Sequence, residues 1–150
     1  MANLSARPRA LTRGLAAAAV AALLTAGEAR AHEGHAHVTT LEDVVASDGR
    51  CSLREAILNT NDNATTHSDC GRGAGDDLIL FDIDGVIVLN SGLPPITDPL
   101  GLTIDALGRD VTLDGNGAGR PITVEAGAKA TIRGLSIRGG RADTGGGILN

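Results

Sequence analysis

The chain has 150 residues, enough for one domain, and a formal net charge of −5 from 13 basic and 18 acidic residues. Because nucleic-acid affinity comes largely from clustered positive charge, this balance argues against a nucleic-acid-binding protein. The 42% share of hydrophobic residues argues against disorder, and with Phe81 as the only aromatic residue the core must be built from Ile, Leu, Val and Ala.

Residues 1–31 have the pattern of an export signal. Three arginines precede an apolar stretch at residues 15–26, and the small-x-small tripeptide at 29–31 predicts cleavage after Ala31. This stretch of about 12 residues is shorter than the roughly 20 that a membrane-spanning helix needs. An uncleaved anchor is the alternative. We therefore expect an exported protein that is secreted or held at the cell surface or outer membrane, with no transmembrane helix after cleavage.

The segment 32–50 opens the mature chain with three histidines. His32, His35 and His37 are weak candidates for ligands of a transition metal. The alternative, which we favour, is a flexible tail, because ordering a tail around a metal costs conformational entropy. No cofactor is therefore expected.

One amphipathic helix is predicted behind this segment. Ser52 is a good N-cap and Glu55 stands three residues later, so the two residues form a capping box. The helix should end near Asn59, where a polar loop begins. One face of the helix is apolar, and its residues are Leu53, Ala56 and Ile57.

The two cysteines flank this helix and its loop. Cys51 and Cys70 are the only cysteines of the chain, and an oxidising compartment outside the cytoplasm favours their pairing. Two free thiols are the alternative, and a metal site is disfavoured because four ligands are normally needed. We expect residues 51–76 to form a disulfide-closed helix and loop.

From residue 77 the pattern changes to short β-type runs, each bounded by Gly, Asp, Asn or Pro. The runs are residues 78–81, 86–89, 102–104, 111–113, 122–124, 130–132, 135–137 and 147–149. Nothing between them is long or periodic enough for the crossover helices of a doubly wound sheet. The pattern favours an all-β solenoid, a right-handed parallel β-helix, whose first coils occupy residues 77–150.

Residues 130–140 illustrate the predicted coil. Ile132, Leu135 and Ile137 should point inward, and Arg133 and Gly134 should form a corner with the arginine side chain outside. The first coil of such a solenoid exposes an apolar core and an unpaired edge, so a cap is needed. The short helix with its disulfide is placed to form that cap.

Two stretches carry a family resemblance. CSLREAI (51–57), followed by Asn61, Cys70 and DDLILFDIDGVIVLNSGLPPITDPLGLTID (76–105), resembles the CSLREA N-terminal domain of secreted bacterial β-helix repeat proteins. VTLDGNGAG, TIRGLSIRGG and GGGILN resemble their first coils, and the last is also similar to the repeat of polymorphic outer-membrane proteins.

The resemblance covers residues 38–150. It implies a pectate-lyase-like β-helix that is secreted or surface-attached, and it implies no particular activity. Members of the family continue for many coils. The C-terminal edge is therefore expected to be continued by further coils or covered by a partner.

The functional interpretation is an exported structural or adhesin-like module, with an unknown extracellular or cell-surface ligand and no evident catalytic residue. The main alternative is a polysaccharide lyase or glycoside hydrolase of the β-helix type. Such enzymes use surface carboxylates and a basic residue. The residues available on the predicted coils are Asp105, Asp110, Asp114, Arg133 and Arg138.

A remote alternative rests on the DIDG motif. An apolar strand followed by Asp82 and Asp84 is similar to the first motif of haloacid-dehalogenase-type phosphatases. The similarity implies a nucleophile at Asp82 and a general acid/base at Asp84, beside Mg²⁺. No helix is predicted after the motif, and Lys129 is the only lysine, so a structural role at a coil corner is favoured.

Overall fold

The computed structural model describes residues 34–150, so the predicted export signal and His32 lie outside the described residues. The described chain is β-rich. Its one helix is α1 (Leu53–Asp62). The strands are β1 (Gly34–Val38), β2 (Asp77–Phe81), β3 (Gly85–Val88), β4 (Leu102–Asp105), β5 (Val111–Asp114), β6 (Ile122–Thr123), β7 (Ala130–Arg133), β8 (Leu135–Arg138) and β9 (Ile148–Leu149).

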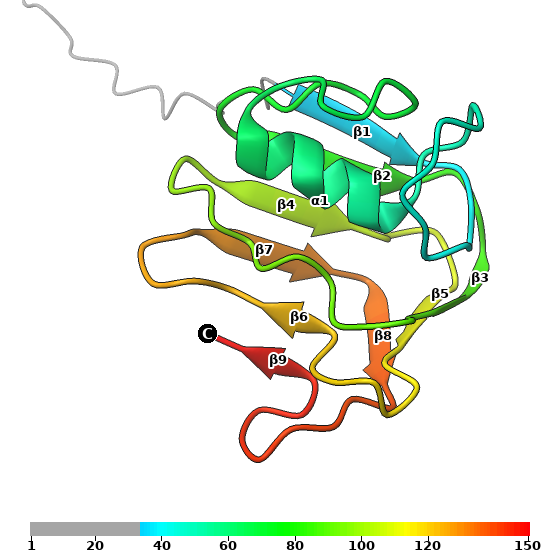
Figure 1. The fold of residues 1–150 in the computed structure, drawn as a ribbon, viewed down its shortest axis with the longest axis vertical. Helices are drawn as coiled ribbons and strands as arrows, with labels where there is room; N and C mark the ends of the chain where they lie inside the picture. The colour runs from blue at the N-terminus through cyan, green and yellow to red at the C-terminus, as the bar shows by residue number, and fades with distance from the viewer. Residues whose placement is uncertain (1–33) are drawn as a thin grey trace, which may run out of the picture.

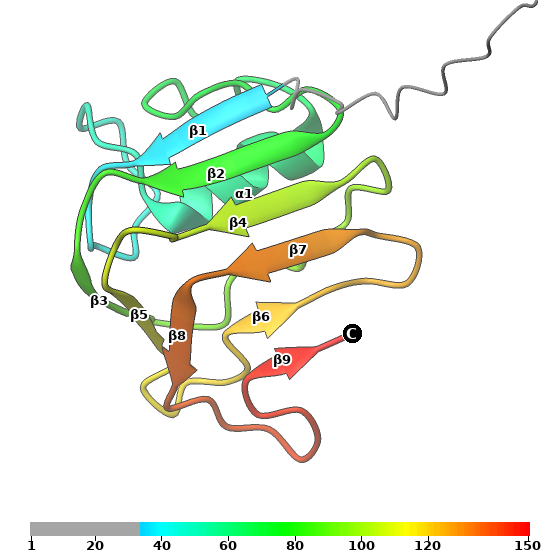
Figure 2. The same ribbon diagram turned by 180° about the vertical axis from the view of Figure 1, so that it is seen from behind.

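The strands form three separate sheets in which every pair is parallel. The first sheet has the order β1-β2-β4-β7, the second β3-β5-β8 and the third β6-β9. Figure 1 shows the first sheet running from β1 at the top to β7, with β9 and the C-terminus below, and Figure 2 shows it from behind. The sheets do not close on one another by hydrogen bonds.

The chain passes from the first sheet to the second and the third, and then returns to the first sheet to begin the next layer. Asp77 of β2 pairs with Leu102 of β4, which pairs with Ala130 of β7. One layer is thus roughly 25 residues long, within the range of known structural repeats. We call residues 77–100 the first layer, 101–125 the second and 126–150 the third.

Aliphatic side chains stack from layer to layer between the sheets. Ile79, Ile104 and Ile132 occupy one register in the first sheet. Ile79 and Ile104 are fully buried, whereas Ile132 of the third layer is half-buried. The second sheet repeats the pattern with a buried upper pair and a half-buried Ile137. Its buried pair is Ile87 and Leu113.

The corner predicted at Gly134 is present between β7 and β8. Gly134 has φ +65°, and a Cβ atom there would lie 2.8 Å from the carbonyl carbon of Ala106 in the layer above. A side chain is excluded by both the backbone conformation and the close approach. Arg133 lies on the exposed side of β7, as expected, and Arg138 lies on the exposed side of β8.

All eight predicted strands are present, and their ends lie within one residue of the prediction. Strand β1 was not predicted. Residues 34–37 are part of this strand and not of a flexible tail, because Ala36 and Val38 are buried in the core while His35 and His37 alternate outward. In the first layer the third sheet has no strand, and Ile96 forms an isolated parallel bridge with Val124.

Candidate functional site

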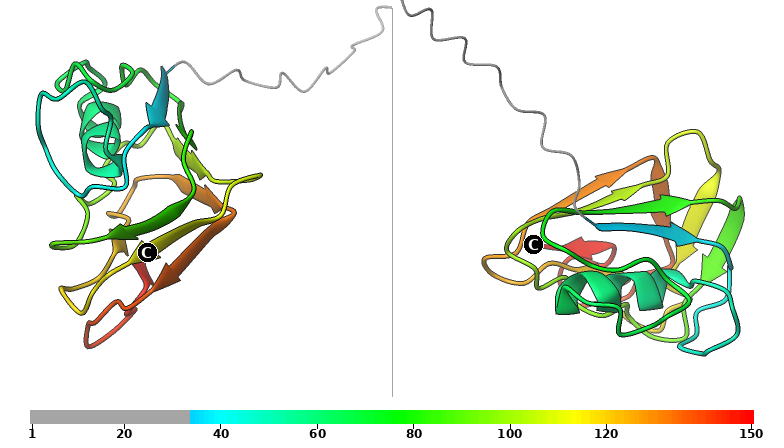
Figure 3. Two further views of the ribbon diagram at one scale, coloured as in Figure 1. Left: turned by 90° about the vertical axis from the view of Figure 1, so that its right-hand side faces the viewer. Right: turned by 90° about the horizontal axis from the view of Figure 1, so that it is seen from above.

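The segment 34–76, here called the cap, lies at the β1 end of the first sheet. It contains β1, a loop at 39–52, α1 and the disulfide loop at 63–76. In Figure 3 (right), α1 runs along one side of the molecule and lies beside β1. The histidine segment and the helical segment, which the sequence treats as separate units, therefore form one unit.

The predicted capping box opens α1. The Ser52 side chain accepts the Glu55 backbone N–H, and the Glu55 carboxylate accepts the Ser52 N–H at 3.0 Å. The helix ends after Asp62, three residues later than predicted, with Asn63 in the left-handed conformation. The predicted apolar face is fully buried, with Leu53, Ala56 and Ile57 at most 1% exposed.

The disulfide joins the start of the helical segment to its loop. Cys51 and Cys70 are bonded, with their Cα atoms 4.8 Å apart, and both residues are buried. Gly73, farther along the same loop, lies so close to the Asn59 carbonyl that a Cβ atom would be 2.0 Å from its oxygen. The loop therefore packs tightly onto the helix.

Glu55 also holds the loop that precedes the helix. Its carboxylate is 1% exposed and accepts the Ala46 N–H at 2.8 Å in addition to that of Ser52. The Ser52 hydroxyl donates to the Val44 carbonyl at 2.6 Å. A buried carboxylate with two backbone donors is satisfied, so Glu55 fixes the path of the loop.

Arg54 connects the cap to the first layer, a role that the sequence did not reveal. Its Nε and Nη2 atoms contact the two carboxylate oxygens of Asp43 at 2.8 and 2.9 Å. The same guanidinium donates to the carbonyls of Ser91 and Gly92, both at 3.1 Å. Asp43 in turn accepts the Asn90 N–H at 2.8 Å.

Two asparagines at the other end of α1 continue this contact. The Asn61 side chain accepts the Thr97 N–H at 2.9 Å and donates to the Pro95 carbonyl at 2.8 Å. Its amide group therefore binds one backbone N–H and one backbone carbonyl of the first layer, as the backbone of a neighbouring strand would. Asn63 donates to the Asp98 carboxylate at 3.0 Å. Helix α1 thus covers the edge of segment 91–98.

The opposite edge of segment 91–98 pairs with the second layer. The Leu93 N–H donates to the Pro121 carbonyl at 3.2 Å, and the Ile96 N–H donates to the Thr123 carbonyl at 2.8 Å. Segment 91–98 therefore lies between α1 and the second layer. Because an exposed strand edge invites pairing with other chains, the helix protects this one.

Asn59 is a second functional residue of the cap that the sequence did not reveal. It is fully buried, accepts the His67 N–H at 2.7 Å, and donates to the carbonyls of His67 and Gly71 at 2.9 and 3.0 Å. These three hydrogen bonds fix the disulfide loop, which the sequence describes only as polar.

The structure separates the candidate metal ligands. His35 and His37 lie on the exposed face of β1, and His32 is outside the described residues. His37 Nδ1 is 3.0 Å from Asp82 Oδ1 at the turn between β2 and β3. Within residues 34–150 no three His, Cys, Asp or Glu residues are grouped to hold a metal ion.

The aspartates of the DIDG motif make structural contacts at that turn. Asp84 accepts the Asp110 N–H at 2.8 Å and lies 3.5 Å from an Arg109 nitrogen, and Asp82 contacts His37. The chain continues directly into β3, without the helix that the phosphatase alternative requires.

The residues proposed for the lyase alternative are divided between two sheets. Arg133 is 3.8 Å from Asp105 on the first sheet, and Arg138 is 3.0 Å from Asp114 on the second. The pKa of Asp114 is lowered, chiefly because its carboxylate accepts the Asn116 N–H and also because Arg138 is adjacent. These four residues form two separate cross-strand ion pairs, and the fifth, Asp110, donates its backbone N–H to Asp84, so the five do not form one cluster.

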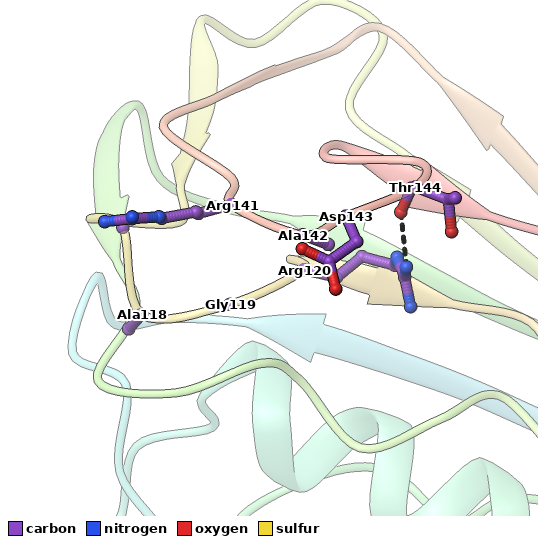
Figure 4. Close-up of a pocket in the computed structure, with 8 residues that line it drawn as sticks. Ala118, Gly119, Arg120, Arg141, Ala142, Asp143 and Thr144 are labelled. Carbon is purple, nitrogen blue, oxygen red and sulfur yellow. Dashed lines mark hydrogen bonds between the residues drawn. The ribbon is translucent and has the colours of Figure 1, made fainter.

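A shallow hollow lies at the corner after β5 and β8 (Figure 4). The loops 117–120 and 141–144 line it, with Arg120 and Arg141 at opposite ends. The Arg120 guanidinium donates to the carbonyls of Thr144 and Gly145. Arg120 therefore joins the second and third layers.

No family model matches the chain, and neither a curated protein nor a solved structure is significantly similar to it. No helix within residues 34–150 has the length and apolar character needed to cross a membrane.

Proposed function

We propose that this chain is a capped, right-handed parallel β-helix module of the CSLREA type that is exported and acts as a rigid structural or adhesive element. The residues of the CSLREAI heptad carry the proposal, because they hold the cap together and attach it to the first layer. These contacts support a structural role for the heptad, in which it closes the end of a β-helix. They require no catalytic role.

Each part of the heptad supports this function in a different way. Cys51 forms the disulfide, Ser52 and Glu55 form the buried capping box, and Arg54 binds Asp43 and the first layer. The remaining residues, Leu53, Ala56 and Ile57, are buried in the core.

The layered sheets support the β-helix. Parallel pairing in register, aliphatic stacks between the sheets and a one-residue glycine corner are the features by which a solenoid buries a continuous core. The disulfide supports export, because disulfides persist in oxidising compartments and are rare in the cytosol.

The experiment is expression of the full chain in a bacterium with a periplasm, followed by intact-mass analysis and activity assays on the exported product. We expect cleavage after Ala31 and a mass that corresponds to one disulfide. We also expect no Ca²⁺-dependent cleavage of acidic polysaccharides and no Mg²⁺-dependent phosphate-ester hydrolysis.

Retention of residues 1–31 in the cytoplasm would contradict the export part of the proposal. Polysaccharide cleavage that Arg133→Gln or Arg138→Gln abolishes would favour the lyase alternative. Hydrolysis that Asp82→Asn abolishes would favour the phosphatase alternative.

A further inference from the structure

The shallow hollow at the corner after β5 and β8 has room for a ligand and plays no part in the cap. Its volume is about 650 Å³, and loops 117–120 and 141–144 line it (Figure 4). All of its lining residues belong to the second and third layers, so a further coil stacked on the third layer is compatible with it. The hollow is therefore complete within the described chain.

Backbone contacts hold the two loops of this hollow in place. The Gly117 N–H donates to the Gly139 carbonyl at 2.7 Å, and the Arg141 N–H donates to the Gly119 carbonyl at 2.9 Å. The Arg120 side chain adds its two hydrogen bonds to carbonyls of the third layer. Because the loops are already ordered, a ligand that binds them loses little affinity to ordering the protein.

Two arginines at opposite ends of the hollow have N–H donors available for a ligand. Arg120 is half-buried and uses two of its N–H groups on carbonyls, so its other N–H groups are available. Arg141 is exposed, and its guanidinium has no hydrogen-bond or ion-pair partner among the described residues. Guanidinium groups bind oxyanions through charge-assisted hydrogen bonds. The two ends of the hollow therefore favour a ligand with acidic groups.

The third ionisable residue of the hollow, Asp143, restricts the ligand further. Its carboxylate is exposed and has no hydrogen-bond or ion-pair partner within residues 34–150. It repels a ligand that has only acidic groups, but it accepts hydrogen bonds from hydroxyl groups. Thr144, which also lines the hollow, adds a hydroxyl group. A ligand that carries both carboxylates and hydroxyls fits this set of residues.

The shape of the hollow favours a chain over a small molecule. Sites for small molecules are concave and bury most of the ligand, whereas this hollow is shallow and open. The third layer, residues 126–150, contains four basic residues and one acidic residue, although the whole chain has a net charge of −5. A chain with repeated acidic groups can therefore cross the hollow and continue over this basic layer.

We propose that the hollow binds an acidic polysaccharide, with carboxylates of the sugar units on Arg120 and Arg141 and sugar hydroxyls on Asp143. The proposal rests on the proposed function, since it names the ligand of an adhesive element, and it involves binding without cleavage. Phe81, the only aromatic residue of the chain, is buried, so no ring is available to stack on a sugar. Ionic contacts between exposed groups must supply much of the affinity, which should fall as salt is added.

The test is calorimetric titration of the oxidised exported chain with alginate oligosaccharides, which carry a carboxylate on every sugar unit. We expect saturable binding that Arg141→Gln weakens about tenfold or more, which corresponds to about 1.4 kcal/mol. Lys129→Gln is the matched control, because it removes the same charge from an exposed position of the third layer outside this hollow. It should leave the affinity nearly unchanged. Oligosaccharides whose carboxylates have been reduced to alcohols should bind at least about tenfold more weakly than the originals.

Asp143→Ala separates recognition of a sugar from simple attraction of a polyanion. Loss of the hydroxyl contacts should weaken binding of the alginate oligosaccharides. Polyglutamate, which has carboxylates but no hydroxyls, should bind the wild type more weakly than alginate does. It should bind Asp143→Ala more tightly than the wild type, because one repelling charge is gone. Circular dichroism checks that each variant is folded.

Three results would overturn the proposal: no binding of the alginate oligosaccharides, equal weakening by Arg141→Gln and Lys129→Gln, or tighter alginate binding by Asp143→Ala. Equal affinities for polyglutamate and alginate would also overturn it and would indicate an acidic peptide as the ligand. None of these results would overturn the proposed function, which is tested independently by export, by intact mass and by the activity assays.

Discussion

The guanidinium of Arg54 and the carboxylate of Asp43 form a two-pronged ion pair, with Nε–Oδ1 at 2.8 Å and Nη2–Oδ2 at 2.9 Å. The Asp43 side chain is 1% exposed and that of Arg54 is 15% exposed. The pair joins the loop before α1 to the helix, and Arg54 also reaches two carbonyls of the first layer. Arg54 thus connects the loop before α1, the helix itself and the first layer.

Arg54→Ala should lower the free energy of unfolding by about 3 kcal/mol or more, because removing one partner leaves the other charge buried without compensation. Arg54→Lys should lie between wild type and Arg54→Ala, since an ammonium cannot reproduce the planar fork. Urea unfolding of each variant at neutral pH measures the differences.

Arg50 provides the matched control for Arg54. It contacts Glu42 and Asp48, both at 2.9 Å, but its side chain is 48% exposed. Arg50→Ala should cost less than about 1 kcal/mol, as exposed ion pairs do. Equal losses for Arg50→Ala and Arg54→Ala would show that Arg54 does not connect the cap to the first layer.

Reduction of the Cys51–Cys70 disulfide should lower the free energy of unfolding by about 3 kcal/mol, the value expected for a closed loop of this length. The urea midpoint of the wild type should therefore fall when reductant is added. The double variant Cys51→Ser/Cys70→Ser should unfold at the lower midpoint and be insensitive to reductant. An unchanged wild-type midpoint would show that the disulfide does not stabilise the cap.

Asn59→Ala should cost about 2 kcal/mol, because three half-buried backbone groups of the disulfide loop lose their partner, which is itself fully buried. Limited proteolysis should then cut the loop at 63–72 more rapidly. Asn61→Ala, two residues later on the same helix, removes two hydrogen bonds that are more exposed and should cost less. A larger loss for Asn61→Ala would reverse this ranking.

Asp114 should contribute stability that depends on pH. Its pKa in the folded protein is below the ordinary 3.8, so the contribution is present above pH 3.8 and is lost as the pH falls through the lower folded pKa. Asp114→Asn should therefore be less stable than wild type at pH 6, and the difference should shrink toward pH 2. Unfolding midpoints across this range measure it.

Asp110→Asn is the control for this pH dependence, since no hydrogen bond or ion pair involves the Asp110 carboxylate within the described part of the chain. A stability difference for Asp114→Asn that stays constant down to pH 2 would show that the ionised carboxylate is not its source.

The strands could be predicted because each has a local signature. Alternation in Val111–Asp114 and Leu135–Arg138, with Gly or Asn after each strand, places both elements correctly. Segment 91–98 of the first layer, which lies beside the third sheet, lacks this alternation because Pro94 and Pro95 precede Ile96. Strand β1 has the alternation, but its two exposed histidines made the segment resemble a tail.

The cap was only partly predictable for a related reason. The capping box of Ser52 and Glu55 is a contact within one helical turn, so its spacing reveals it. The pairing of Arg54 with Asp43 joins positions 11 residues apart across an irregular loop, where no periodicity applies. The contacts of Asn61 span still more of the chain and depend on the fold being already formed.

The measurement that tests the capped-layer account most directly is native-state hydrogen exchange over residues 34–150, on the wild type and on Arg54→Ala. The account predicts that amides of α1, β2 and β4 exchange slowest and that those of β8 and β9 exchange fastest. It also predicts that Arg54→Ala selectively speeds exchange at Leu93 and Ile96, which lie beneath the helix. Equal protection of the third layer and of β2 and β4, with no local effect of Arg54→Ala, would contradict the account.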